Sequence, residues 1–215
     1  MESKSMARKN LTSVITGDLI NSRKIKKPSQ WLAPLKKALR TEGKTPQIWE
    51  IYRGDSFQVE IKNPADAFLM AIRIKATIKC IKNLDVRMAI GIGTKEFTGS
   101  KLTESNGEAF IYSGEKLESI KKEKYTLALK TPWVDFDKEM NLCIRLALIA
   151  MDNWSRGSAE LITVLIDRQD TTQKKLAGIL GIYQSSVSER QKRAHYTEIM
   201  ELESLYRERI NRLML

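Results

Sequence analysis

The segment 172–188 constrains this chain most, because its small and apolar residues stand where a helix-turn-helix needs them. Ala177 comes four residues before Gly181, which places Ala177 where the first helix crosses the second and lets Gly181 take the positive φ of the turn. Val187 is expected to anchor the second helix on the core. Three further apolar residues are expected to complete the buried face: Ile179, Leu180 and Ile182. The pattern predicts a helix-turn-helix over about 172–195.

The residues after this turn have the composition of a recognition helix, the helix that enters the major groove of DNA. Polar groups that can reach base edges are Gln184, Ser185, Ser186 and Ser188, and cations that can meet phosphates are Arg190, Lys192 and Arg193. Because residues 172–196 carry five basic side chains and one acidic one, the composition favours DNA as a partner. Two alternatives stay open: an ordinary helical hairpin with a polar outer face, and a related module used for protein contacts.

The net charge of +11 is unevenly distributed along the chain. Residues 1–130 carry 25 Lys and Arg against 14 Asp and Glu, whereas residues 131–215 carry 12 of each sign. A basic first part suggests a polyanionic partner, such as nucleic acid or the phosphates of a nucleotide. A generally lysine-rich proteome would give the same balance, so charge alone does not decide between the two.

Neither a membrane span nor a secretion signal is evident in the sequence. The most apolar stretch, Leu142–Met151, is shorter than the roughly 20 residues that a span requires, and it contains Arg145. The segment Met1–Asn10 has charges but no apolar h-region. These features predict a cytoplasmic protein without a membrane partner.

The few cysteine and histidine residues exclude several kinds of chemistry. Cys80 and Cys143 lie 63 positions apart in apolar surroundings, which is typical of reduced, buried thiols rather than of a disulfide framework or a zinc site. His195 is the single histidine. Ser-His-Asp hydrolysis and metal sites with several histidines are therefore not expected.

Hydrophobic periodicity and turn residues predict alternating strands and helices up to residue 132. The expected strands are 11–20, 47–53, 56–61, 84–93 and 125–129, and the expected helices are 28–39, 64–78 and 106–121. Their order, βαββαβ followed by αβ, predicts a compact α+β sheet with helices on one face. From residue 136 the pattern is helical throughout. We expect an α+β domain over 1–132 and an all-α domain over 133–215, which contains the helix-turn-helix and a long last helix.

The last helix carries an apolar stripe made of Ile199, Leu202, Tyr206, Ile210 and Leu213. The stripe is too short for a confident coiled-coil assignment, and packing on the domain is favoured over self-association through this stripe alone. A homodimer stays open, because many DNA readers pair to match two half-sites.

Asp18 and Asp55 form the chemically suggestive pair of carboxylates. Asp18 closes the first buried strand, and Asp55 stands at the tip of the neighbouring hairpin, so adjacent strands would bring them together. Two close carboxylates repel each other unless a cation lies between them, and Mg²⁺ with triphosphate oxygens is the usual solution. The alternative is structural, because Gly-Asp is a common turn dipeptide and Asp18 could cap the segment after its strand.

Four segments together resemble the bacterial SatD family, and the resemblance covers nearly the whole chain. They are 15–23 (ITGDLINSR), 52–58 (YRGDSFQ), 86–93 (VRMAIGIG) and 105–110 (SNGEAF). The first half is in turn similar to the palm-type fold of class III nucleotidyl cyclases and diguanylate cyclases, which implies a palm or ferredoxin-like βαββαβ domain. Those proteins hold two metal ions with an aspartate on the first strand and one on the hairpin, which match Asp18 and Asp55.

The same resemblance implies a nucleotide site with Arg23, Gly54, Arg87 and Lys116, where Arg23 or the adjacent Lys24 would meet phosphate. Cyclases also carry an Asn and an Arg on the helix that follows a glycine matched here by Gly107. No such pair stands in 111–116 (IYSGEK). Lys116 could replace the arginine only as a point charge, because lysine lacks the planar guanidinium group that donates two parallel hydrogen bonds. The resemblance therefore leaves open whether the domain is catalytic.

We expect a cytoplasmic DNA-binding protein, a transcriptional regulator whose palm-like domain senses a nucleotide or a related phosphate ligand. The alternative from another class is a Mg²⁺-dependent nucleotidyl cyclase or nucleotidyltransferase. A third possibility is a structural adaptor that uses the helical half for protein contacts.

Overall fold

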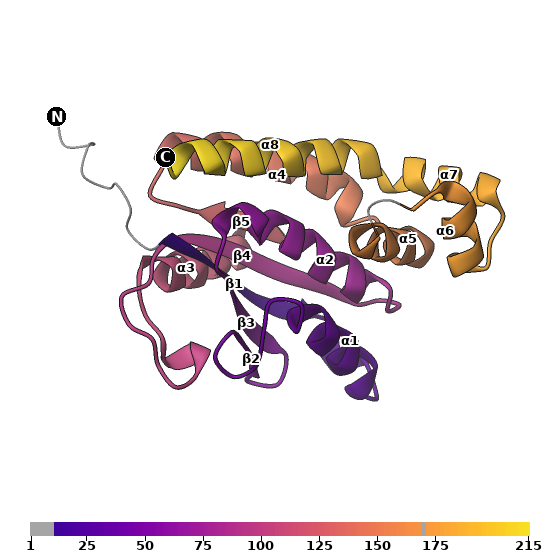
Figure 1. Ribbon diagram of the computed structural model, residues 1–215. Helices are drawn as coiled ribbons and strands as arrows, with labels where there is room; N and C mark the ends of the chain where they lie inside the picture. Colours follow the sequence, from indigo (N-terminus) through magenta and orange to yellow (C-terminus); the bar gives the residue numbers. More distant parts are fainter. Residues whose placement is uncertain (1–10, 169–170) are drawn as a thin grey trace.

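The computed structural model describes residues 11–168 and 171–215 (Figure 1). The segment Met1–Asn10, for which no secretion signal is predicted, lies outside these ranges. In the first half the elements are β1 (Leu11–Ile20), η1 (Ser22–Lys24), α1 (Ser29–Leu39), β2 (Trp49–Tyr52), β3 (Ser56–Ile61), η2 (Pro64–Asp66), α2 (Ala67–Lys79), β4 (Asp85–Thr94), η3 (Leu102–Glu104), α3 (Glu108–Glu123) and β5 (Leu127–Lys130). In the second half they are α4 (Val134–Met151), α5 (Arg156–Asp167), α6 (Gln173–Leu180), α7 (Gln184–Ala194) and α8 (Tyr196–Leu213).

The strands form a mixed sheet with the order β2-β3-β1-β4-β5. The β1–β3, β1–β4 and β2–β3 pairs are antiparallel, and β4–β5 is parallel. Each predicted strand and helix is present, which confirms the α+β class. The predicted second strand was too long, because its pairing with β3 runs only from Trp49 to Tyr52.

Helices cover both faces of the sheet, so the expectation of helices on one face was wrong. Successive side chains of β1 point to opposite faces, and both sets are buried. Ile15 and Leu19 belong to the large core that α1 and α2 close, whereas Val14 packs with Ala109 and Phe110 of α3. The second buried face belongs to α3, the crossover helix of the parallel β4–β5 pair, which also packs on Ala89 of β4 and Ala128 of β5.

Gly91 lets α3 lie very close to the sheet. A Cβ atom built on Gly91 would stand 2.1 Å from the carbonyl oxygen of Ala109 and 2.4 Å from the amide nitrogen of Ser113. Only a residue without a side chain allows this approach. Beside it, the Ser113 and Thr16 hydroxyls share a buried hydrogen bond of 2.8 Å that ties α3 to β1.

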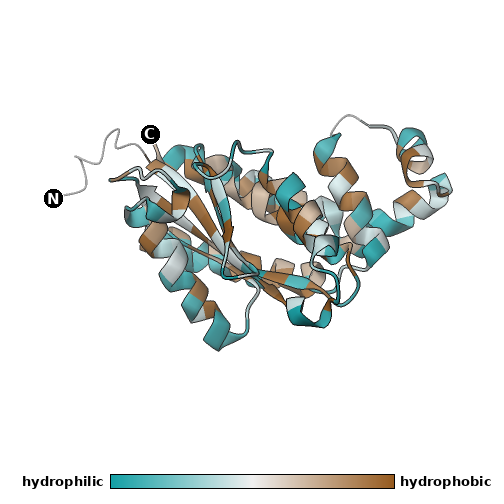
Figure 2. Cartoon of the chain, turned by 90° about the horizontal axis from the view of Figure 1, so that it is seen from below, coloured by the Kyte–Doolittle hydropathy of each residue, from teal (hydrophilic) through white to brown (hydrophobic). Residues whose placement is uncertain are grey.

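The helical second half packs on the sheet half through a shared apolar core. In that core α4 contacts β5, α5 contacts α2, and α8 lies along η2 and α2 (Figure 1). The fully buried Tyr206 donates a 2.8 Å hydrogen bond to the Pro64 carbonyl, and its ring packs against Phe68 and Phe136. Figure 2 shows that apolar and polar residues alternate along the helices. The predicted boundary at 132 falls between β5 and α4, and the independence of the two parts stays a prediction.

The apolar stripe of the last helix packs on the domain, as favoured from the sequence. Ile199, Tyr206 and Ile210 are buried, and Leu202 and Leu213 are partly buried against the same core. Cys80 and Cys143 are free and half-buried. Within the described ranges, no helix combines the length and the apolar character needed to cross a membrane.

Candidate functional site

The segment predicted as a helix-turn-helix forms two helices, α6 and α7, joined at Gly181. The Thr172 hydroxyl caps α6 by accepting from the Lys175 amide. Gly181 ends α6 with φ 63°, and the Ile182 amide donates to the Ala177 carbonyl at 3.0 Å. Glycine adopts this left-handed conformation without the steric cost that a side chain would add. The conformation lets the chain turn directly into α7.

A small core of its own holds the two helices together. It is made of Leu161 and Leu165 from α5, Leu176 and Ala177 from α6, and Val187 from α7. Leu180 and Ile182 pack against it as predicted, but Ile179 was wrongly assigned to this face and is 43% exposed. At 3.6 residues per turn, Leu176 and Leu180 point inward together, which turns Ile179 outward.

The outer side of α7 is polar and faces away from that core. Gln184, Ser185, Lys192 and Arg193 are exposed, whereas Ser186, Ser188 and Arg190 are partly exposed. Tyr183, just before the helix, is 84% exposed. The motif lies at one end of the molecule, so the polar start of α7 is not covered by the sheet half (Figure 1).

The three predicted phosphate-binding cations of α7 are not equivalent. Arg190 donates to the Gly157 carbonyl at 3.4 Å and lies 3.9 Å from a Glu160 carboxylate oxygen, so it ties α7 to α5. Arg193 forms a 2.7 Å ion pair with Glu189 on its own helix. Among the described residues, Lys192 has no ion-pair partner. Lys192 is therefore the α7 cation that is most available to a phosphate.

The second predicted site lies where β1 ends. The register places Arg87 of β4 and Ser56 of β3 directly opposite Asp18, on either side of it. A guanidinium nitrogen of Arg87 lies 3.3 Å from one Asp18 carboxylate oxygen, and the Lys121 ammonium lies 3.2 Å from the other. The Asp18 carboxylate thus forms ion pairs with two cations. One of them is Arg87, which the sequence predicted as a nucleotide-binding residue.

Lys121 is the member of this cluster that the sequence did not reveal. Burial lowers its pKa, but hydrogen bonds to Glu118 and Asp18 outweigh that effect, and the pKa of Lys121 lies above its ordinary value. Lys121 is therefore a cation at neutral pH. Its position near the end of α3 could have been inferred, because a crossover helix that follows β4 runs back toward the start of that strand, where Arg87 lies.

Two more groups of the hairpin lie near the cluster. Burial raises the pKa of the Tyr52 hydroxyl, and the positive charges of Arg53 and Lys121 offset part of that rise. The Asp55 backbone carbonyl accepts from the Leu19 amide at 3.2 Å, and the Asp55 carboxylate accepts from the Ser22 hydroxyl. The hairpin tip and the end of β1 are therefore adjacent, as predicted.

In this arrangement the two carboxylates do not offer a bare site for Mg²⁺. Asp18 is already neutralised by Arg87 and Lys121, and a divalent cation would be repelled by both. Asp55 is engaged by Ser22, and the described residues contain no group of three or more metal-ligating side chains of the His, Cys, Asp and Glu types. The magnesium site stays a prediction.

The other predicted nucleotide-binding residues are spread around the same end of the sheet or lie away from it. Arg23 is exposed in η1, directly after Ser22, and Gly54 stands at the open hairpin tip, with no atom within 4 Å of a built Cβ. Lys116 lies near a different carboxylate, that of Asp137: burial raises the pKa of Asp137, and hydrogen bonds from Thr131 and the charge of Lys116 offset part of that rise. Lys121, not Lys116, is the α3 cation at Asp18.

Comparison with known protein families decides the relationship. A model of the SatD family matches residues 12–200. The chain belongs to the SatD family. The match covers the sheet, α4 and α5, the helix-turn-helix and the start of α8, so both candidate sites lie inside the SatD region. Neither the curated proteins nor the solved structures compared with the chain contain a match.

Proposed function

We propose that this SatD-family chain is a DNA-binding regulator of transcription, and that α7 is its recognition helix. The observation that carries the proposal is the exposed polar start of α7, which follows the Gly181 turn and is anchored by Val187 in the small core that also contains Ala177. Such a helix can enter the major groove with its first residues on base edges. The exposed Lys174 and Lys175 of α6 add positive charge beside it.

DNA binding is tested by fluorescence anisotropy with a pool of labelled duplexes across a salt series. We expect binding that weakens steeply with salt, because phosphate contacts release counterions. Lys192→Ala should weaken binding to all sequences alike and reduce the salt slope by about 1. Gln184→Ala should instead alter sequence preference, by about 1–3 kcal/mol of discrimination, once a preferred site has been selected.

Lys37→Ala is the matched control, because Lys37 is an exposed cation on α1, away from α7. It removes the same charge and should leave the salt slope unchanged. Arg190→Ala is less informative, since it also removes the contact of α7 with Gly157 and Glu160. Absence of binding at low salt, or equal losses in Lys192→Ala and Lys37→Ala, would contradict the assignment of α7.

A second candidate function is the sensing of a phosphate ligand at the end of β1. Arg87 and Lys121 converge on Asp18, and the buried Arg87 Nε has no hydrogen-bond partner among the described residues. A phosphate of a nucleotide would offer these cations better acceptors than one carboxylate. We therefore propose an anion site in which Asp18 holds the cations in place and competes with the ligand.

This anion site and the magnesium site make opposite predictions for Asp18→Asn. If phosphate competes with Asp18, the variant should bind ATP or GTP more tightly than the unmodified protein, with or without Mg²⁺. If Asp18 holds a metal, the variant should lose Mg²⁺-dependent binding. Calorimetric titration measures both, and Asp135→Asn, at a 92% exposed side chain on α4, controls for the change in net charge. No heat with either nucleotide would contradict a nucleotide sensor.

A Mg²⁺-dependent cyclase or nucleotidyltransferase is the alternative proposal. It requires Asp18 to be released from Arg87 and Lys121 before a metal can bind. Loss of Mg²⁺-dependent nucleotide binding in Asp18→Asn would favour it over the sensor.

A further inference from the structure

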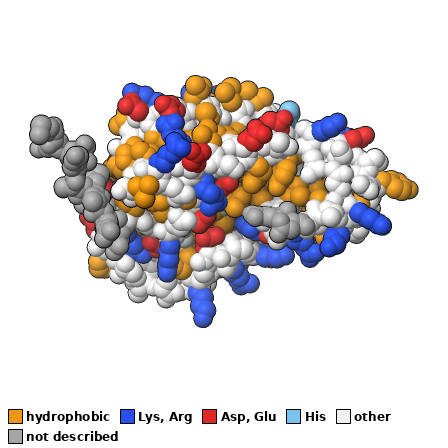
Figure 3. Space-filling view, turned by 45° about the horizontal axis from the view of Figure 1, so that its top comes forward, with side chains coloured by type: hydrophobic (Ala, Val, Ile, Leu, Met, Phe, Trp, Pro, Cys, Tyr) orange, Lys and Arg blue, Asp and Glu red, His pale blue; other side chains and the backbone are white. Residues whose placement is uncertain are grey.

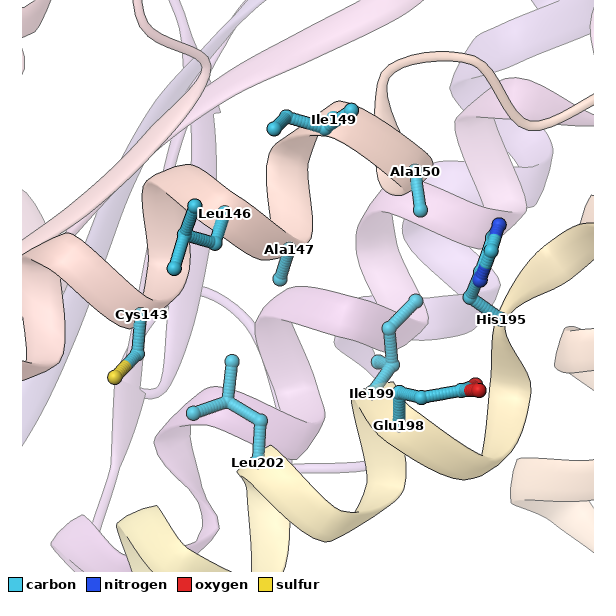
Figure 4. A pocket seen from close by; sticks show the side chains of 9 residues that line it. All are labelled: Cys143, Leu146, Ala147, Ile149, Ala150, His195, Glu198, Ile199 and Leu202. Carbon is cyan, nitrogen blue, oxygen red and sulfur yellow. The ribbon is translucent and has the colours of Figure 1, made fainter.

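An apolar groove runs between α4 and α8, on the side of the molecule that faces away from the sheet. It encloses about 430 Å³, and its walls are Cys143, Leu146, Ala147 and Ala150 from α4 and Ile199 and Leu202 from α8 (Figure 4). His195 and Glu198 close the end nearest α7. The groove belongs to neither candidate site.

Large apolar side chains stand exposed along this groove. Leu142, Leu146 and Ile149 are 51%, 60% and 70% exposed, and their spacing of four and three residues places them in one stripe on α4. Leu205 of α8 is exposed too, in a separate shallow hollow on the outer side of that helix. Figure 3 shows hydrophobic side chains gathered on this side. A stripe of this kind beside an apolar groove marks an interaction surface rather than a solvated face.

We propose that a second copy of this chain covers the groove, with α4 of each copy packed against α8 of the other. The size of the surface supports this occupant. Both helices have 18 residues. At 1.5 Å per residue and about 10 Å per helix width, the face measures about 27 Å by 20 Å, so two copies bury on the order of 1,100 Å². That area clears the threshold of about 1,000 Å² for a specific interface.

Charge at the two edges of the face also fits a second copy. Arg145 lies on the α4 edge away from α8, where it stacks over Tyr125, and Lys138 lies seven residues earlier on the same edge. Glu201 and Glu208 are exposed on the outer side of α8, opposite the buried Ile199 and Tyr206. A two-fold axis parallel to the helices places α4 of each copy over α8 of the other, so the basic α4 edge approaches these carboxylates.

Arg145 and Glu201 are the useful pair for a test. Lys138 and Glu208 each have an ion-pair partner on their own helix, Asp135 and Arg212. Within the described ranges, neither Arg145 nor Glu201 takes part in an ion pair. In the proposed dimer, Arg145 of one copy would form an ion pair with Glu201 of the other, so both side chains would gain a partner.

Pairing also suits the proposed DNA function, and this step rests on that function. One α7 reads a single half-site, whereas two copies related by a two-fold axis read a palindromic site with greater specificity. The groove ends at His195, the residue between α7 and α8, so the pairing surface is continuous with the helix-turn-helix.

Sedimentation velocity of the full chain without DNA tests the proposal across a concentration series. We expect a species of twice the chain mass. Leu146→Glu and Ile149→Glu should each raise the dissociation constant at least about tenfold, because each buries a carboxylate in an apolar contact. Ile111→Glu is the matched control: Ile111 is similarly exposed, but it lies on α3, on the other face of the sheet. It should leave the dimer intact.

Charge reversal separates the predicted arrangement from other dimers. Arg145→Glu should weaken the dimer, and the double variant with Glu201→Arg should restore it. Leu146, Ile149, Ile111 and Glu201 are exposed and Arg145 is partly exposed, so circular dichroism should show folded variants. A monomer at every concentration, or a dimer that Leu146→Glu leaves unchanged, would overturn the proposal. The sedimentation experiment contains no DNA. It therefore tests the dimer even if the chain turns out not to bind DNA.

Discussion

Lys75→Met is expected to lower the free energy of unfolding by about 3 kcal/mol, because it leaves two carboxylates around a buried position without their cation. The Lys75 side chain is completely buried, and its ammonium lies 2.9 Å from Asp85 and 2.7 Å from Asp152. It also donates to the Thr126 hydroxyl at 3.2 Å. One side chain thus joins α2, the start of β4, the residue before β5 and the end of α4.

The partners of Lys75 set the size of this effect. Asp85 keeps a second cation, Lys79, at 3.4 Å, and the Asp152 side chain is 36% exposed. Water can therefore relieve part of the unpaired charge, which places the expected loss at the lower end of the range of about 3–5 kcal/mol for broken buried pairs. The methionine retains an apolar chain of similar length, so packing contributes little to the loss.

Urea unfolding followed by circular dichroism measures the change. Lys82→Met is the matched control, because Lys82 is exposed a few residues after α2. It should change stability by less than about 0.5 kcal/mol. A double-mutant cycle with Asp152→Asn should show that the two losses are not additive. Equal, small effects of Lys75→Met and Lys82→Met would show that the buried cation does not stabilise the fold.

Most of the two-helix segment could be predicted from the sequence, because its geometry is local. Ala177, Gly181 and Val187 lie within eleven residues of one another, and each role follows from side-chain size or backbone freedom. Ile179 was misplaced because three large apolar residues within four positions do not show which of them face inward. That choice depends on α5, which supplies Leu161 and Leu165 to the core.

The cluster at Asp18 could be predicted only in part, because it depends on long-range topology. Asp18 and Arg87 are cross-strand neighbours, which the strand order determines. Lys121 joins them only because α3 crosses on the face opposite to α1 and α2. The available signal in the sequence was the lack of charged residues in 11–17 (LTSVITG), because a strand covered on both faces has no solvent-facing polar set.

The exposed stripe of α4 was not predictable from its sequence. The run 142–151 is apolar on almost every side of the helix, a pattern that normally predicts complete burial. Only packing shows that Ile144 and Leu148 face the core while Leu146 and Ile149 do not. This excess of apolar residues is what a helix with a core face and a partner face requires.

Gly91→Ala is expected to destabilise the fold by about 3 kcal/mol or more, because the added methyl group collides with backbone that cannot move alone. The colliding atoms are the Ala109 carbonyl oxygen and the Ser113 amide nitrogen, both in α3. Relief requires the whole helix to shift away from β1 and β4. That shift would also weaken the buried hydrogen bond between Thr16 and Ser113 and draw Lys121 away from Asp18.

Gly114→Ala provides the matched control on α3 itself. A Cβ on Gly114 meets no atom within 4 Å, so the same substitution should stabilise the helix by about 0.5–1 kcal/mol. Thermal and urea unfolding of the two variants should therefore change in opposite directions. If Gly91→Ala were as stable as the unmodified protein, α3 would not lie against β4 as described, and Lys121 would have no fixed position at Asp18. The stability of the fold and the proposed phosphate site thus both depend on one close helix–strand contact.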